Sequence, residues 1–579
     1  PTYNSNTVAV ANFDGSIIYG ANSGIKAYCG LVTDIDGDDP KTLFISYATN
    51  GTQVLTVNTA PTTLTSGNTI TFSTGNTATI EAYYTDPITG VNKIFVSNTT
   101  GTQNSAFGFK ALEANTVASS NSAFGYFSLL TNTIGANNTS VGYNNLRFNT
   151  TGSFNSGFGV NSLTGNTIGT HNSAFGYRTL FANTTGSFNN AFGGWALTAN
   201  TIGVANNAFG YNALYSNTTG VNNTAVGYRS LYQNTIGTSN AAFGYSALRN
   251  NTVGSANNAF GYGALYTNTT GAYNNAFGHG ALFNNTIASA NGAFGFRALY
   301  SNTTGGSNNA FGYYALRLNT TGSNNSAFGF QSLRNNTIGT NNSAFGKDAL
   351  KYNTIGISNS GFGYRSLFNN TIGTVNSAFG KDSLYNNTTG SYNTAVGYSA
   401  LYGNTTGVNN SAFGYQALLS NTGGQGNTAL GNASLRNNTI GVYNTAIASG
   451  ALYNNTTGNY NSAVGFYSLL LNTTGAYNSA FGMYAMRNNT GGVRNSAFGY
   501  GALLTNSVGT NNTAVGYLAL YTNIANDNTA VGYRALFLNT TGVANVAVGT
   551  SALENNTVGV YNNAFGHGAL YNNTIGAYN

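Results

Sequence analysis

The sequence predicts an all-β protein, a parallel β-solenoid with coils of 17 residues that follows a smaller β domain. One motif recurs at a fixed short period from about residue 98 to residue 579, which is the signature of a repeat that buries its faces by stacking. The residues around the central glycine of the motif alternate as in a strand. The 35 Phe and 40 Tyr recur largely in register with that period, which argues against disorder despite only 5% charged residues.

The repeat is clearest at Asn206 to Asn222, with the sequence NNAFGYNALYSNTTGVN. Its glycine recurs at Gly108, Gly125 and Gly142 and continues in steps of 17 to Gly431. Ala448 then takes the place of one glycine, and Gly532 comes one residue early. From Gly108 to Gly566 there are 28 units. Positions are numbered below from this glycine, which is position 0.

Each unit is expected to contain one strand, here described for Gly210 and its neighbours. Ala208 and Gly210 should point to one side, and Phe209 and Tyr211 to the other, because successive side chains of a strand alternate. Leu214 follows Tyr211 by three residues, which breaks the alternation and predicts a bend just before it.

The block Asn217-Thr218-Thr219-Gly220 that follows is typical of a turn. Its glycine is expected to supply a positive φ, and its Asn either a left-handed residue or a side chain bonded to backbone. Stacked coils place Asn on Asn, and such columns can form amide ladders along the axis. The column concerned contains Asn200, Asn217, Asn234 and Asn251.

A domain boundary is predicted near residue 98, giving domains 1–97 and 98–579. All four prolines lie before it, where short β-prone runs alternate with Gly, Asn, Asp and Pro. These runs are Thr7 to Phe13, Lys41 to Tyr47, Val54 to Val57, Thr69 to Phe72, Thr77 to Tyr84 and Lys93 to Val96. The first domain is therefore expected to be a small all-β sandwich or barrel that attaches the array to something else.

Charge changes sign at the same boundary. Residues 1–100 hold seven acidic residues and three Lys, a formal charge of −4, whereas the array holds 16 basic and five acidic residues, a charge of +11. Most of the array's arginines fall two or five residues after the glycine, and these two columns are predicted to face solvent. They are Arg178, Arg229, Arg297, Arg365 and Arg534 at position 2, and Arg147, Arg249, Arg317, Arg334, Arg436 and Arg487 at position 5. A sparse positive stripe suits weak attraction to anionic glycans, lipids or nucleic acid, and solubility would explain it equally well. It is not the dense patch that specific nucleic-acid binding needs.

The sequence favours neither catalysis nor a cofactor. The acidic run Asp34, Asp36, Asp38 and Asp39 could suit calcium, but it lacks the spacing of an EF-hand, so a solvated turn is the default reading. Cys29 is the only cysteine and is expected to be a small buried residue. The three histidines, His171, His279 and His567, stand in different units without ligand spacing. No apolar run is long enough to span a membrane, and the protein is expected not to be an enzyme.

Units such as Asn223-Thr224-Ala225-Val226-Gly227 and Asn104-Ser105-Ala106-Phe107-Gly108 resemble the head repeats of trimeric autotransporter adhesins. They are closer to the Asn-Thr-Ala-Val-Gly-Tyr-x-Ala-Leu repeats of phage and virus tail-fibre proteins. The resemblance covers residues 98–579. It implies a left-handed parallel β-roll, usually trimeric, used for surface attachment, although the adhesin period is shorter than 17.

The leading hypothesis is a non-enzymatic structural fibre, extracellular or on a virion, that serves as a rigid spacer and attachment element. Side-by-side association, most simply as trimers, is expected because the strand leaves an apolar strip on a thin coil. One alternative is a subunit of a filament joined head to tail, because the last turns are regular and encode no polar cap. The strand that would then cover the neighbour's end is Thr7, Val8, Ala9, Val10, Ala11, Asn12 and Phe13. A lower-ranked alternative is ice binding by the Thr-bearing turns.

Overall fold

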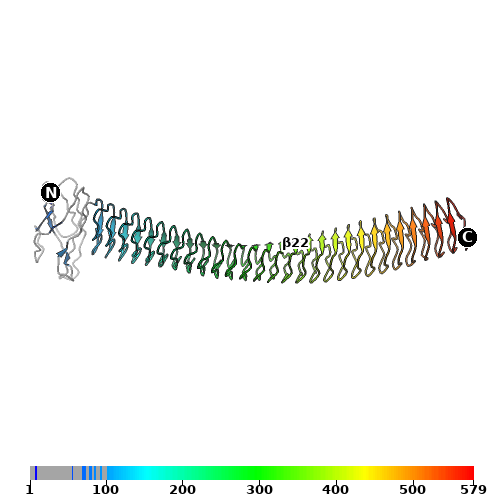
Figure 1. The fold of residues 1–579 in the computed structure, drawn as a ribbon, viewed down its shortest axis with the longest axis horizontal. Coiled ribbons are helices and arrows are strands. Elements are labelled where there is room, and N and C mark those ends of the chain that lie inside the picture. Colours follow the sequence, from blue (N-terminus) through cyan, green and yellow to red (C-terminus); the bar gives the residue numbers. More distant parts are fainter. Residues whose placement is uncertain are drawn as a thin grey trace. The chain divides into compact units, whose positions relative to one another are not determined.

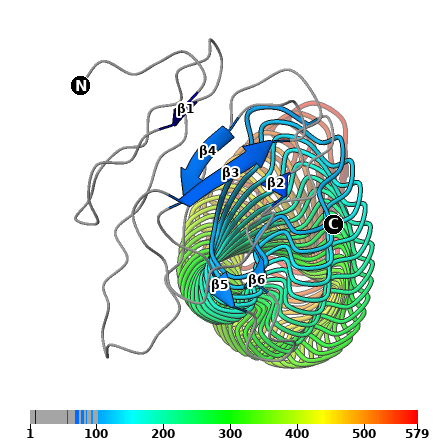
Figure 2. The same ribbon diagram turned by 90° about the vertical axis from the view of Figure 1, so that its left-hand side faces the viewer.

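The computed structural model describes residues 101–579 in full and only six short strands among the first hundred residues. These strands are β1 (Thr7–Val8), β2 (Leu55–Thr56), β3 (Asn68–Phe72), β4 (Thr77–Ile80), β5 (Tyr84–Thr85) and β6 (Asn92–Lys93). β1 pairs in parallel with β4, β4 pairs antiparallel with β3, and β3 pairs antiparallel with β2 (Figure 2). β5 and β6 form a separate antiparallel pair. The predicted run Lys41 to Tyr47 and the residues that would complete a sandwich lie outside the described part, so the sandwich and the boundary near residue 98 stay predictions.

The contacts of the chain divide it into two units, and each is described by itself. One comprises Pro1–Gly280 and Asn284–Ile287, and the other Ala281–Phe283 and Ala288–Asn579. The array strands of the first unit are β7 (Ser105–Phe107), β8 (Ser122–Phe124), β9 (Thr139–Val141), β10 (Ser156–Phe158), β11 (Ser173–Phe175), β12 (Asn190–Phe192), β13 (Asn207–Phe209), β14 (Thr224–Val226), β15 (Ala241–Phe243), β16 (Asn258–Phe260) and β17 (Asn275–Phe277).

The strands of the second unit are β18 (Gly292–Phe294), β19 (Asn309–Phe311), β20 (Ser326–Phe328), β21 (Ser343–Phe345), β22 (Ser360–Phe362), β23 (Ser377–Phe379), β24 (Thr394–Val396), β25 (Ser411–Phe413), β26 (Thr428–Leu430), β27 (Thr445–Ile447), β28 (Ser462–Val464), β29 (Ser479–Phe481), β30 (Ser496–Phe498), β31 (Thr513–Val515), β32 (Thr529–Val531), β33 (Val546–Val548) and β34 (Asn563–Phe565). The described residues contain no helix. The predicted all-β solenoid, with one strand for each of its 28 repeats, is confirmed.

Within each unit, neighbouring strands pair in parallel and in register, so that equivalent residues of successive coils face each other (Figure 1). Ala208 of β13, for example, lies opposite Ala225 of β14. The three-residue strands are only part of the pairing, because the turns are also bonded from coil to coil. The backbone N–H of Leu214 donates to the carbonyl of Ser230 at 3.0 Å, for instance. Most of the circumference of a coil therefore takes part in one continuous hydrogen-bonded stack.

The interior of each coil is thin and is filled by a small set of side chains. Ala208, Ala213 and Leu214 are fully buried, as are their counterparts in most other coils. The strand orientation predicted for Ala208 is thus the inward one. Two Ala and one Leu supply only a small apolar volume in each coil. The rest of the interior is filled by polar side chains.

Two columns of buried Asn complete the interior. At position 7, Asn217 Nδ2 donates to Asn200 Oδ1 at 2.8 Å and to the carbonyl of Gly220 at 3.1 Å, which is the predicted amide ladder. At position 13, the backbone N–H and the Nδ2 of Asn223 both donate to Asn206 Oδ1, at 3.0 and 3.1 Å. This second ladder was not predicted. Together the two ladders satisfy amides that would otherwise be buried without partners.

The glycines are required for two different reasons. Gly210 has a φ of +141°, and a Cβ there would also lie 2.5 Å from the carbonyl oxygen of Gly227. The prediction of a positive φ at Gly220 is wrong, since its φ is not positive. A Cβ at Gly220 would instead lie 2.5 Å from the carbonyl oxygen of Gly237 in the next coil. The glycine of the turn is therefore needed for close approach of the backbones.

The left-handed backbone occurs at residues that have side chains. In this coil Asn212, Leu214 and Asn222 have φ values of +59°, +51° and +58°. The bend predicted beside Leu214 is thus made by two left-handed residues in close succession. A left-handed conformation costs an L-residue about 1–2 kcal/mol. Burial of the position 4 side chain, which is Met486 in one coil and Leu in the others, must offset that cost in all coils but the last, where Leu570 is 38% exposed.

Two coils depart from the repeat without losing the stack. Ala448 replaces the position 0 glycine and adopts a φ of +104°. The coil from Gly516 to Gly532 is one residue short, yet β31 and β32 remain in register. The missing residue is accommodated in the turn. Asn523 Nδ2 donates to the carbonyl of Ala525, two residues ahead, whereas in other coils the acceptor is three residues ahead.

Candidate interaction surface

The outward side of the strand carries an uninterrupted apolar column, called here the aromatic stripe. It consists of the last residue of each strand from β7 to β34 and is Phe, Val, Leu or Ile in all 28 coils. Because Ala208 points inward, the next side chain, Phe209, points outward and is 40% exposed. A column without one polar residue on an exposed face is unusual for a surface in contact with water.

The rings of the aromatic stripe stack on one another. Phe158, Phe175 and Phe192 have centroid separations of 4.6 Å and interplanar angles of 7–8°. In the second unit, Phe328 and Phe345 are 4.7 Å apart at 7°. The centroid separation is close to the spacing of paired strands, so each ring face lies against the next ring, and the ring edges are what the surface presents.

A second outward column follows at position 1, where 14 of the 28 residues are tyrosine. Tyr228, Tyr245 and Tyr262 stack at centroid separations of 5.0 and 5.1 Å. His279 continues this column on Tyr262 at 5.0 Å. His171 likewise stacks between Phe154 and Phe188 at position 12. Both histidines of the first unit therefore occupy places in ring ladders.

The arginine columns are not simply solvent-facing, and that prediction needs correction. The guanidinium of Arg178 lies 4.4 Å from the ring centroid of Phe181 and 4.7 Å from that of Trp195. The guanidinium of Arg534 lies 4.2 Å from Phe537. The Nε atom is buried in seven of these arginines, namely Arg147, Arg178, Arg229, Arg297, Arg317, Arg334 and Arg534. The reason is that positions 2 and 5 are neighbours on the coil, and an aromatic residue often occupies position 5, so the guanidinium packs on a ring.

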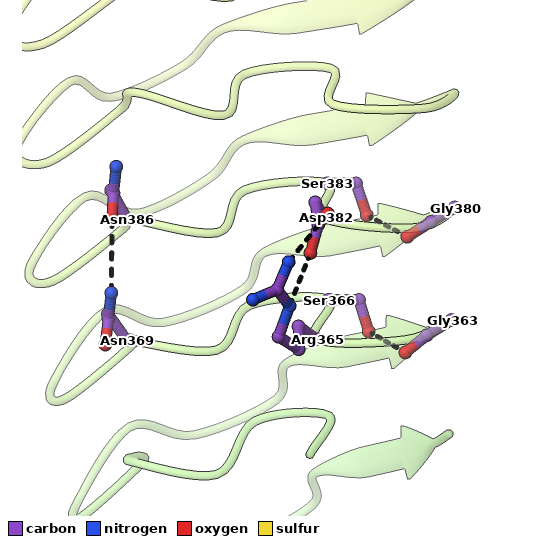
Figure 3. A network of polar contacts seen from close by, with 8 residues as sticks. All are labelled: Gly363, Arg365, Ser366, Asn369, Gly380, Asp382, Ser383 and Asn386. Carbon is purple, nitrogen blue, oxygen red and sulfur yellow. Dashed lines mark hydrogen bonds and ion pairs between the residues drawn. The ribbon is translucent and has the colours of Figure 1, made fainter. Parts of the chain in front are cut away.

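Ion pairs follow the same two columns. Arg365 and Asp382 stand at position 2 of successive coils, with Nε donating to Oδ1 at 2.8 Å and Nη2 to Oδ2 at 3.1 Å (Figure 3). Hydrogen bonding to Asp382 raises the pKa of the Arg365 guanidinium above its usual value. The side chain of Asp382 is only 6% exposed. The pair therefore satisfies a carboxylate that the coil has nearly removed from water.

Several residues that the sequence singled out are not brought to this surface by the described structure. Asp34, Asp36, Asp38 and Asp39, together with Cys29, lie outside the described residues. Of the proposed assembly strand, only Thr7–Val8 is described, and β1 is paired with β4. Among the described residues no three His, Cys, Asp or Glu side chains gather as a metal site. No helix in the described part has the length and apolar character needed to cross a bilayer.

Searches with protein-family models, against curated proteins and against solved structures returned no match for this chain. The fold places the chain in the class of rigid β-solenoid repeat proteins.

Proposed function

We propose that the protein is a structural fibre element, extracellular or carried on a virion, whose arrays associate side by side through the aromatic stripe and carry an attachment surface. The observation that supports this is the unbroken apolar column on the outward face of the strands. The stacked coils are rigid because most of their circumference is hydrogen bonded to the next coil. A closed trimer, the arrangement that the resemblance to tail-fibre repeats implies, would cover the stripe of each chain.

The energetics favour association of long arrays. Fully burying a Phe side chain stabilises by about 1.5–3 kcal/mol. Phe209 and Phe379 are 40% and 41% exposed, and most other stripe residues are half-buried, so covering them is worth roughly 0.5–1 kcal/mol per coil. Association costs about 4–15 kcal/mol in lost freedom. The 17 strands of the second unit alone can thus exceed the cost, whereas a few coils cannot.

The experiment is to weaken the stripe and measure the mass of the particle by light scattering. Replacing Phe311, Phe328 and Phe345 with Ser should dissociate the oligomer or shift it to higher protein concentration. The control changes Ile338, Ile355 and Ile372 at position 9 to Ser. These side chains are apolar and more exposed than the three Phe, and their replacement should leave the mass unchanged. A wild-type protein that is a monomer at micromolar concentration would contradict the proposal.

The structure offers less support for the head-to-tail filament and for ice binding than for side-by-side association. In a head-to-tail filament, Thr7–Val8 of the proposed assembly strand would have to exchange its pairing with β4 for a neighbour's coil. For ice binding, the position 8 hydroxyls are already engaged, since Thr218 Oγ1 donates to the carbonyl of Thr235 at 3.1 Å. The exposed position 9 column mixes Thr with Ile and Val, as at Ile202 and Val253.

A further inference from the structure

The tyrosine column of the second unit is interrupted once by basic residues. Between Phe330 and Tyr398 the position 1 residues are Lys347, Tyr364 and Lys381. These are the only two lysines at position 1 of the array. The interruption therefore places two ammonium groups in a column that is otherwise mostly aromatic.

Three cations surround the ring of Tyr364. Lys347 Nζ and Lys381 Nζ lie 5.8 and 6.0 Å from its centroid, and the guanidinium carbon of Arg365 lies 4.7 Å from it. Lys347 is also 5.8 Å from the ring of Phe330, and Lys381 is 5.3 Å from that of Tyr398. The rings thus hold both lysine side chains in place, which lowers the conformational entropy they would lose on binding a ligand.

The nearby carboxylates do not neutralise these lysines. Asp382 is held by Arg365 through two hydrogen bonds, and Asp348 Oδ1 lies 3.2 Å from Lys351 Nζ. No ion pair within residues 101–579 includes Lys347 or Lys381, and both side chains are exposed. Two positive charges therefore face outward, two coils apart, at a separation of about 9.6 Å along the stack.

We infer that Lys347 and Lys381 form a binding site for a linear acidic polysaccharide that lies along the stack and places its carboxylate or sulfate groups on the two ammonium groups. This deepens the attachment role proposed above and rests on it. The two-coil spacing lets two acidic groups of one polymer chain contact the two ammonium groups at the same time. Single-stranded nucleic acid binds through bases stacked on open aromatic faces, but the cations cover the faces of Tyr364. An anionic bilayer is recognised by clusters of four to eight basic residues, and two lysines are too few.

The test measures binding of the full chain to heparin, a sulfated polysaccharide, as a function of salt concentration. In the variant K347Y/K381Y both lysines are replaced by the residue most common at position 1, so the column is restored and the coil should fold. We expect affinity to fall roughly thirtyfold, or about fivefold for each lysine. Its dependence on salt should become shallower, because fewer counterions are released. The matched control R317Q/R487Q removes two charges at position 5 of the same unit and should change affinity less than twofold, and K347R/K381R should retain binding.

Unchanged affinity in K347Y/K381Y, an equal loss in R317Q/R487Q, or a wild-type chain that does not bind heparin would each overturn the site. Oligonucleotides and phosphatidylserine vesicles are measured in parallel. If either binds as tightly as heparin and loses binding in K347Y/K381Y, the partner class is wrong. Light scattering on the same samples separates the two proposals, because loss of heparin binding with an intact oligomer contradicts only the site, whereas a monomer contradicts the fibre.

Discussion

The buried and the outward-facing positions of the same coil differ in how much their residue type can vary. Position 7 is Asn in each coil that holds a ladder bond, and its side chain is buried in all of these coils except the last, at Asn573. Position 1, a few residues away, ranges from Tyr211 to Gly194 and Lys347 without disturbing the stack. The comparison teaches that the fold depends on buried amides and on close backbone contact, whereas the outward columns can change to suit partners. Four substitutions test that division.

The largest effect is expected for Asn387→Ala. Asn387 Nδ2 donates to Asn370 Oδ1 at 2.7 Å and to the carbonyl of Gly390 at 2.8 Å, and its Oδ1 accepts from Asn404 at 2.7 Å. Leaving these buried partners unsatisfied should cost about 3–5 kcal/mol of unfolding free energy. The measurement is chemical denaturation followed by circular dichroism.

The adjacent residue supplies the control. Asn386 is only half-buried and makes one side-chain ladder bond, at 3.2 Å with Asn369 (Figure 3). Asn386→Ala should therefore cost less than about 1 kcal/mol. Equal losses for the two variants would show that burial of the ladder is not what stabilises the coil.

The next effect is expected for Gly380→Ala. Its φ is +132°, and a Cβ would lie 2.5 Å from the carbonyl oxygen of Gly397. Backbone strain and overlap together should cost about 2–4 kcal/mol, which lowers the midpoint of thermal unfolding. Gly194→Ala, at the outward position 1 where the nearest atom is 3.4 Å away, is the matched glycine and should be nearly neutral.

A smaller, coupled effect is expected where the interior is packed differently. Asn145 takes the place of the usual Ala or Ser at position 3, and Gly157 stands where the next coil normally has Ala. A Cβ at Gly157 would overlap the side-chain oxygen of Asn145, so Gly157→Ala should cost about 1–3 kcal/mol. Adding Asn145→Ala should recover much of that loss, because it recreates the Ala pair of other coils, such as Ala213 and Ala225. A double-mutant cycle in which the two costs simply add would contradict the coupling.

The smallest effect, and the only gain, is expected for Ala448→Gly. Ala448 holds a φ of +104° at the glycine position. Relief of that strain should stabilise the protein by about 1 kcal/mol, detectable as a higher denaturation midpoint. Ala446→Gly, at a buried strand position without a positive φ, should instead destabilise it.

The sequence predicted the parts of this structure that depend on period and alternation. The register, the placing of Ala208 and Phe209 on opposite faces, the bend near Leu214 and the amide ladder through Asn217 all follow from side-chain direction and from stacking like on like. The alternation did not show which of the two faces is the inner one. It did not predict which residues are left-handed, because Leu214 adopts a conformation that residue-type rules reserve for glycine, and only burial in a stacked coil makes it favourable. It also placed Arg178 and its equivalents in solvent. The rings that pack on Arg178 are Phe181, three residues ahead in the same coil, and Trp195 at position 2 of the next coil, and periodicity alone does not show that they lie against the guanidinium. The calcium and assembly-strand hypotheses concern residues that the structure does not describe, or describes only in part.

The Asn ladders give the stack a direction. In the position 7 column, Asn217 donates to the coil before it, and Asn234 donates to Asn217 in turn. Every carboxamide therefore points the same way, and a coil laid down in the reverse sense would set oxygen against oxygen or NH₂ against NH₂. Each finished coil acts as a template that accepts the next one in a single orientation. In a chain of near-identical repeats, coils paired in a shifted or inverted way would otherwise compete with the native pairing. The direction of the Asn ladder disfavours the inverted pairings during folding.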